Sequence, residues 1–330
     1  MNLIFNEKFE KLTTHIRSRL TPENITPKYL YHYICDFIEL YTFFYKDRLT
    51  KSAIIDLFDD AGFNLASLSE KNLSSLDQSE KDNLKESSVD WIFNILQYRK
   101  SLNDFEYAFD IDDVAIVLKE NLSFKQKLYL VLLFASNLSI FIEYQSDITS
   151  EFEAISYYAI KDFFPQATVK QFGKNSDYTG NAKTKIKALA KDMNMSIDEP
   201  EINKIPTPNS QERGLDIIAW IAFSDKYTNM LTYLIQCAAG KDWINKFSEV
   251  YRYDSYFHFK KLSPSGIMMI PYSLNINGDY EQSDDIISSK ALLLDRLRIL
   301  EVIKNESELE SQQFVSITLV EKLLEKDIQL

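Results

Sequence analysis

The chain has 330 residues, of which 45% are hydrophobic, and its formal net charge at pH 7 is −12. This length allows about two domains, at roughly 150 residues each. Seven glycines and eight prolines exclude a collagen-like or linker-rich protein, two cysteines exclude a disulfide framework, and three histidines argue against a histidine-built metal site or catalytic triad.

The net negative charge weighs against non-specific binding of nucleic acid by the chain as a whole, although it leaves room for a local basic groove. The first residues are charged and lack the apolar core of a signal peptide. Together with the scarcity of cysteine, this predicts a reducing, cytoplasmic setting.

The first part of the chain has the apolar spacing of helices almost throughout. Helices are predicted over residues 29–44, 89–98 and 112–120 and from residue 123 to about 144, with an exposed connection over residues 67–86. The most apolar stretch, residues 128–142, is shorter than the ~20 residues that span a bilayer, so no membrane segment is expected. Residues 1–145 are therefore predicted to form an α-helical domain.

After a polar segment at residues 145–150, the pattern changes to alternating helices and strands. A helix is expected over residues 151–164, a strand over 167–172 and a helix over 183–193. There follow two strands joined by a turn at residues 224–226, a helix over 242–253, a strand over 266–272, and helices over 286–303 and 316–326. The predicted fold class is α+β, with residues 146–330 forming an α/β domain around a mixed central sheet.

The segment 214–243 carries the residues best suited to chemistry. Asp216 lies among apolar residues in the first strand of the hairpin, where an isolated carboxylate needs a partner or a metal. Gln236 ends the second strand, Lys241 begins the next predicted helix, and Glu153 lies in the first turn of the leading helix. Phosphodiester hydrolysis needs oxygen ligands for Mg²⁺ and a cation near the phosphate. Asp216, Glu153 and Gln236 are the candidate ligands, and Lys241 is the candidate cation.

These residues resemble, in type and order, the PD-(D/E)XK nuclease superfamily, which has the restriction-endonuclease-like fold. The resemblance is to the branch in which Gln replaces the second acidic residue, as in methylation-dependent restriction enzymes. Phe152-Glu153, Gly214-Leu215-Asp216 and Gln236-Cys237 stand where that branch has its leading-helix Glu, its Asp and its Gln. The resemblance that carries these motifs covers residues 151–247 and departs from the family at Ala238, where the family usually has its lysine.

The whole chain resembles, more loosely, bacterial proteins with a GLD…QCAxGKxW signature that look like components of defence systems. Together, the two resemblances imply a DNA endonuclease that uses Mg²⁺ or Mn²⁺. They also imply that it acts in antiviral (anti-phage) defence, with other proteins of a defence complex as partners.

A lysine-rich stretch follows the leading helix. Between residues 170 and 191 the only acidic residue among six lysines is Asp177. Because lysine contacts to phosphates are independent of base sequence, this stretch is a candidate DNA-binding surface, or alternatively only a solvated face. The candidate DNA-binding residues are Lys170, Lys174, Lys183, Lys185 and Lys187.

Each site residue also has a plainer interpretation. Asp216 can be a structural carboxylate, Glu153 and Lys241 can be surface residues, and Gln236 can hydrogen-bond backbone at a sheet edge. Cys237 is expected to be a small core residue rather than a nucleophile, since no histidine is near it in sequence. The alternative for the whole chain is a non-catalytic DNA- or protein-binding subunit with a degenerate nuclease fold. A nucleotide-binding enzyme is less favoured, because no glycine-rich phosphate loop is present.

Overall fold

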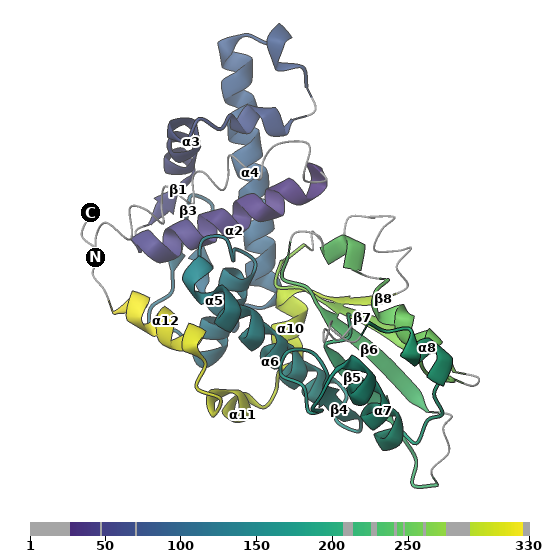
Figure 1. Cartoon of the computed structure of the whole chain (residues 1–330). Helices are drawn as coiled ribbons and strands as arrows, with labels where there is room; N and C mark the ends of the chain where they lie inside the picture. The colour runs from purple at the N-terminus through teal and green to yellow at the C-terminus, as the bar shows by residue number, and fades with distance from the viewer. Residues whose placement is uncertain are drawn as a thin grey trace. The chain divides into compact units, whose positions relative to one another are not determined.

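The computed structural model describes residues 27–46, 48–69, 71–206, 214–225, 230–240, 243–246, 248–259, 262–274 and 291–325 (Figure 1). The chain divides into two compact units. Unit 1 comprises Met1–Gln145, Tyr272–Glu281 and Ile317–Leu330, and unit 2 comprises Ser146–Pro271 and Gln282–Ser316. The predicted α+β fold class is confirmed by the helices together with a mixed five-stranded sheet and a three-stranded antiparallel sheet.

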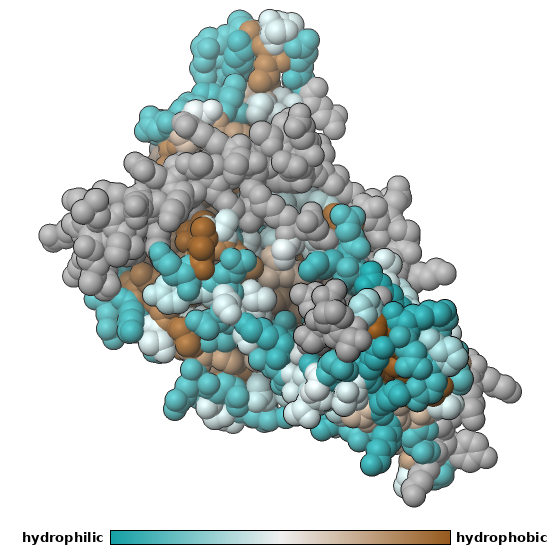
Figure 2. All heavy atoms as spheres, in the orientation of Figure 1, coloured by the Kyte–Doolittle hydropathy of each residue, from teal (hydrophilic) through white to brown (hydrophobic). Residues whose placement is uncertain are grey.

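Hydrophilic residues cover most of the described surface that faces the viewer in Figure 2. No helix in the described part of the chain is both long enough and apolar enough to cross a lipid bilayer.

Unit 1 is mainly helical and contains a small sheet in the order β1-β3-β2. Its elements are α2 (Pro27–Tyr45), β1 (Leu49–Thr50), α3 (Lys51–Asp60), η1 (Leu65–Leu68), η2 (Leu73–Ser75), α4 (Gln78–Leu102), β2 (Phe109–Ile111), β3 (Ala115–Leu118), α5 (Phe124–Ala135), η3 (Ile142–Tyr144) and most of α12 (Val315–Leu324).

The prediction of a helix over residues 112–120 is wrong, because this segment forms β3 and the turn before it. The carboxylate of Asp112 accepts hydrogen bonds from the backbone N–H groups of Val114 and Ala115, each at 2.8 Å. This turn brings β2 and β3 into antiparallel register, with Ile111 opposite Ile116. Side-chain bonds of this kind compete with helix formation, and the β-branched residues that follow favour a strand.

α4 also begins earlier than predicted, inside the segment expected to be an exposed connection. Asp77 and Glu80 form a reciprocal capping box, in which each side chain accepts a hydrogen bond from the other residue's backbone N–H at 2.9 Å. A capping box stabilises the first turn of a helix although the residues around it are polar. α4 therefore runs for 25 residues.

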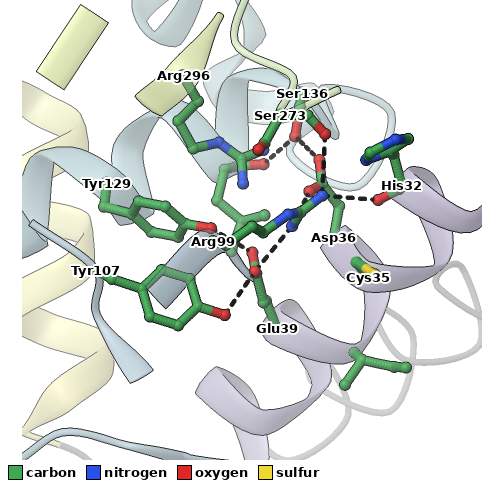
Figure 3. A network of polar contacts seen from close by, with 12 residues as sticks. His32, Cys35, Asp36, Glu39, Arg99, Tyr107, Tyr129, Ser136, Ser273 and Arg296 are labelled. Atoms are coloured by element: carbon green, nitrogen blue, oxygen red, sulfur yellow. Dashed lines mark hydrogen bonds and ion pairs between the residues drawn. The ribbon is translucent and has the colours of Figure 1, made fainter. Parts of the chain in front are cut away.

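A buried charged network lies at the centre of unit 1 (Figure 3). Arg99 on α4 is fully buried, and its Nη1 lies 2.8 Å from both Asp36 Oδ1 and Glu39 Oε1 on α2. Glu39 also accepts hydrogen bonds from the hydroxyls of Tyr107 and Tyr129, at 2.9 and 2.8 Å. Because buried charges are costly unless they are paired, the network requires one alignment of α2 against α4.

Unit 2 is built on the five-stranded sheet, whose order is β4-β5-β6-β7-β8. β4, β5 and β6 are antiparallel neighbours, whereas β7 runs parallel to β6 and β8 parallel to β7. Its elements are α6 (Gln145–Phe163), β4 (Thr168–Gln171), α7 (Ala182–Asp192), α8 (Glu199–Asn203), β5 (Ile217–Ile221), β6 (Leu231–Cys237), η4 (Trp243–Lys246), η5 (Val250–Ser255), β7 (Ser265–Met269), β8 (Ala291–Leu294), α10 (Arg296–Val302) and α11 (Glu306–Glu310).

The predicted hairpin is confirmed as β5 and β6, which pair from Ile217 opposite Ile235 to Ile221 opposite Leu231. Two predictions are wrong in detail. The segment expected to be a helix over residues 242–253 contains the 3₁₀ helices η4 and η5. The segment expected to be helical over residues 286–303 contains β8 before α10. A four-residue apolar run such as Ala-Leu-Leu-Leu cannot be assigned to strand or helix from its periodicity.

The two faces of the sheet pack against different elements. Ile218, Trp220 and Leu234 face a core cluster shared with buried residues of α7 and η5. On the other face, Tyr233 of β6 stacks on Phe164, directly after α6, with ring centroids 4.3 Å apart. Successive strand side chains point to opposite faces, so Gln236 belongs to the η5 face and Cys237 to the α6 face.

Unit 1 provides a test of pH dependence at His32. Burial, and secondarily the charge of Arg99, lowers the pKa of this imidazole to about 3 from its usual 6.5. The unfolded chain therefore binds a proton below pH 6.5 that the folded chain does not bind until about pH 3. His32 thus makes no contribution above pH 6.5 and disfavours the folded chain below it, so that the free energy of unfolding falls as the pH decreases below 6.5, by up to about 1.4 kcal/mol per pH unit.

Urea unfolding of wild type and His32→Gln at pH 7.5 and 5.5 measures this effect. We expect the wild type to lose about 1 kcal/mol more stability than the variant between the two values. Equal losses would show that His32 does not carry the pH dependence.

Candidate functional site

Asp216 lies where β4 and β6 end and β5 begins. Its backbone carbonyl accepts hydrogen bonds from Phe172 N at 2.7 Å and Gly173 N at 2.9 Å, directly after β4. Its own N–H donates to Ile235 O at 3.1 Å, and its Oδ2 accepts from Cys237 N at 2.7 Å, both on β6. Backbone and side chain are thus both held, so the position of this carboxylate is set by the sheet.

Glu153 reaches the same place from α6. Its Oε2 accepts a hydrogen bond from Lys174 N at 3.2 Å, directly after Gly173. A Cβ atom added to Gly173 would lie 3.1 Å from this oxygen and 2.9 Å from Asp216 Oδ1. The structure therefore brings the two predicted carboxylates together over one glycine, from a helix and a strand that are distant in sequence.

Gln236 lies on β6 directly before Cys237, whose N–H group binds Asp216. The Gln236 side chain is 3% exposed, and its Nε2 donates to Glu249 Oε2 at 2.8 Å. Its Oε1 is buried and has no hydrogen-bond partner in the described part of the chain. The predicted sheet-end position is thus observed, and the amide oxygen is an acceptor that can serve a ligand.

Glu249 was not predicted as a site residue. It lies directly before η5, in a segment expected to be an ordinary helix, and no local pattern distinguishes it from the other acidic residues. Only the tertiary fold brings it to Gln236. Gly214 lies against it, because a Cβ atom added there would be 2.6 Å from Glu249 Cβ.

Cys237 lies within reach of the charges of both carboxylates. Burial raises the pKa of its thiol well above the usual value, and the negative charges of Asp216 and Glu153 raise it further. The thiol therefore stays protonated at neutral pH and is a poor nucleophile. Cys237 is half-buried rather than part of the buried core.

Lys241, the predicted cation of the site, lies outside the described residues. Its role therefore stays a prediction. Ala238, at the position where the family usually has lysine, is fully buried, and its N–H donates to Met269 O at 2.9 Å.

Several lysines of the lysine-rich stretch have neighbours within unit 2. Lys185 is 7% exposed, and Lys170 is half-buried on β4. Three other ammonium groups donate to neighbours in unit 2: Lys174 to Ser146 O and Oγ, Lys183 to Asn203 O, and Lys187 to Glu199. Since the Lys187–Glu199 pair is exposed, exchanging its carboxylate for a phosphate costs about 0–1 kcal/mol. Lys187 and Lys191, both exposed on α7, are therefore the members of this stretch most available to DNA.

The donor set fits a hard divalent cation better than a soft one. No group of three or more His, Cys, Asp and Glu side chains in the described part of the chain is arranged to hold a metal. The site instead offers two carboxylates and one unpartnered amide oxygen. Oxygen donors of this kind suit Mg²⁺ or Mn²⁺, whereas zinc sites use thiolate and imidazole ligands.

No protein-family model, curated protein or solved structure matches the chain. The functional assignment therefore depends on the residues and geometry of the site itself.

Gly173 is a test of the close approach between the two carboxylates. Its backbone does not have a positive φ angle, so alanine fits the backbone and only the added methyl group matters. Gly173→Ala should destabilise unit 2 by about 1–3 kcal/mol, the usual cost of overpacking. The control is Gly240→Ala, where an added Cβ atom would meet no atom of the described residues within 4 Å. Urea unfolding measures both variants, and equal stabilities would contradict the described packing.

Proposed function

We propose that the protein is a DNA nuclease that hydrolyses phosphodiester bonds with Mg²⁺ or Mn²⁺. The observation that carries this proposal is the meeting of Asp216 and Glu153 beside Gly173, with the buried Gln236 amide on the next strand. Two carboxylates that face one point repel each other when both are charged, and a bound cation removes this repulsion.

The sheet supports the same proposal. The PD-(D/E)XK resemblance implies a mixed central sheet with the Asp and the Gln on neighbouring strands. Asp216 at the start of β5 and Gln236 in β6 occupy such positions in a sheet that combines antiparallel and parallel pairs. α6 precedes the sheet and supplies Glu153, as the leading helix does in that family.

In the proposed mechanism the chain holds the reactants in place. Asp216, Glu153 and the Gln236 Oε1 atom would hold the cation, which when bound lowers the pKa of water and offsets charge on the phosphate. The Cys237 and Lys174 N–H groups fix the two carboxylates. Lys241 is proposed to orient the attacking water.

The proposed setting is the cytoplasm, in antiviral defence of a bacterial cell. The proposed partners are DNA and other proteins of a defence complex. Both proposals rest on the GLD…QCAxGKxW signature.

A cleavage assay on plasmid and single-stranded DNA with Mg²⁺ or Mn²⁺ tests the proposal. We expect wild type to cut, and Asp216→Asn and Glu153→Gln each to cut about 100-fold more slowly, a typical loss when one electrostatic group of a transition state is removed. Lys241→Ala should also lower the rate. The control Glu301→Gln removes an exposed carboxylate of α10 and should cut as wild type does. Equal cutting by Asp216→Asn and wild type would refute the proposal.

The second candidate function is a non-catalytic DNA- or protein-binding subunit with a degenerate nuclease fold. It is favoured by the buried Ala238 at the position of the family's lysine. In this case wild type binds DNA or co-purifies with a partner protein without cutting DNA, and Asp216→Ala keeps full phage protection.

A further inference from the structure

Gln236 has a fixed orientation because of its partner. The two ends of a side-chain amide have nearly the same shape, but one accepts hydrogen bonds and the other donates them. A carboxylate can only accept, so the contact of 2.8 Å between Gln236 and Glu249 Oε2 must be made through Nε2. This contact leaves Oε1 as the free end.

The free oxygen lies in a buried place. Gln236 is 3% exposed, and Oε1 has no hydrogen-bond partner in the described part of the chain. An unpaired buried acceptor is unfavourable, so this orientation is not favoured by the Gln236 side chain alone. A cation bound by Oε1 would favour this orientation of the amide.

The backbone next to Glu249 is adapted to this contact. Gly214 has φ +86°, and a Cβ atom there would lie 2.6 Å from Glu249 Cβ and 2.8 Å from Glu249 Oε2. Only glycine adopts this conformation readily and leaves this space. Gly214 is two residues before Asp216, so the segment that supplies the aspartate also makes room for Glu249.

We propose that Glu249 is a positioning residue of the metal site. It holds the Gln236 amide with Oε1 toward a divalent cation, and it supplies, one hydrogen bond away, the negative charge that Gln236 lacks. This inference rests on the proposed nuclease function, because that function provides the cation.

The pair can be exchanged to test this role. Gln236→Glu alone places two carboxylates in contact. In the double variant Gln236→Glu/Glu249→Gln the hydrogen bond is restored with donor and acceptor reversed, and residue 236 presents a carboxylate oxygen to the cation. The double variant therefore separates the role of the pair from that of either side chain.

Electron paramagnetic resonance of Mn²⁺ titrated into the full chain gives a readout that does not depend on DNA cleavage. We expect Glu249→Ala to weaken Mn²⁺ binding about 10–100-fold, the range for loss of a residue that orients a metal ligand. Gln236→Glu alone should lose stability, because two carboxylates then meet without a cation, while the double variant should be as stable as wild type and bind Mn²⁺ at least as tightly. The control Glu199→Ala removes an exposed carboxylate and should bind as wild type does. Urea unfolding of each variant shows that it is folded.

The outcomes separate this inference from the proposed function. If wild type binds Mn²⁺ and Asp216→Asn does not, the result supports the metal site. Unchanged Mn²⁺ binding by Glu249→Ala would then overturn the role of Glu249. If the double variant regains stability but binds Mn²⁺ more weakly than wild type, Glu249 has a structural role only and the inference fails. If wild type binds no Mn²⁺, both the proposed function and the inference fail.

Discussion

Hydrogen bonds to one aspartate determine the geometry of the candidate site in unit 2. Asp216 is bonded through its N–H, its carbonyl and its carboxylate to segments at the ends of β4 and β6. Fixing Asp216 in this way also fixes Gly173, which lies against the Glu153 carboxylate, and Cys237, which precedes the buried Ala238. Two of the seven glycines in the chain, Gly173 and Gly214, lie within this small region. Their placement shows that the site depends on close backbone approach.

Unit 1 contains charged side chains that are buried in its core. The Arg99 guanidinium and the carboxylates of Asp36 and Glu39 are buried together, where an unmatched charge would be strongly unfavourable. The tyrosine hydroxyls that complete the network explain part of the aromatic richness of this half of the chain. Hydrophobic packing alone tolerates small shifts between helices, whereas the paired charges of this network do not, because a shift would leave a buried charge without its partner.

The sequence predicted the elements with strong periodicity and missed those set by local hydrogen bonds or by strand pairing. The hairpin, α6, β4 and α7 follow from apolar spacing. The turn at Asp112 and the capping box at Asp77 depend on single polar side chains, and β8 is stabilised by pairing with β7, which no local pattern reveals. The meeting of Asp216 with Glu153 was predictable from motif order. Glu249 was not, because its neighbour in space is 13 positions away across an irregular segment.

The chain returns to unit 1 at its last helix, and this affects the order in which the two units can fold during translation. Residues of α12 from Ile317 onward belong to unit 1, where Glu321 pairs with Lys127 at 2.6 Å and Val320 is fully buried. On the ribosome, all of unit 2 emerges before this last segment does. The sheet that carries Asp216 can therefore assemble while unit 1 is still incomplete, and the two units cannot be separated by a single cut in the chain.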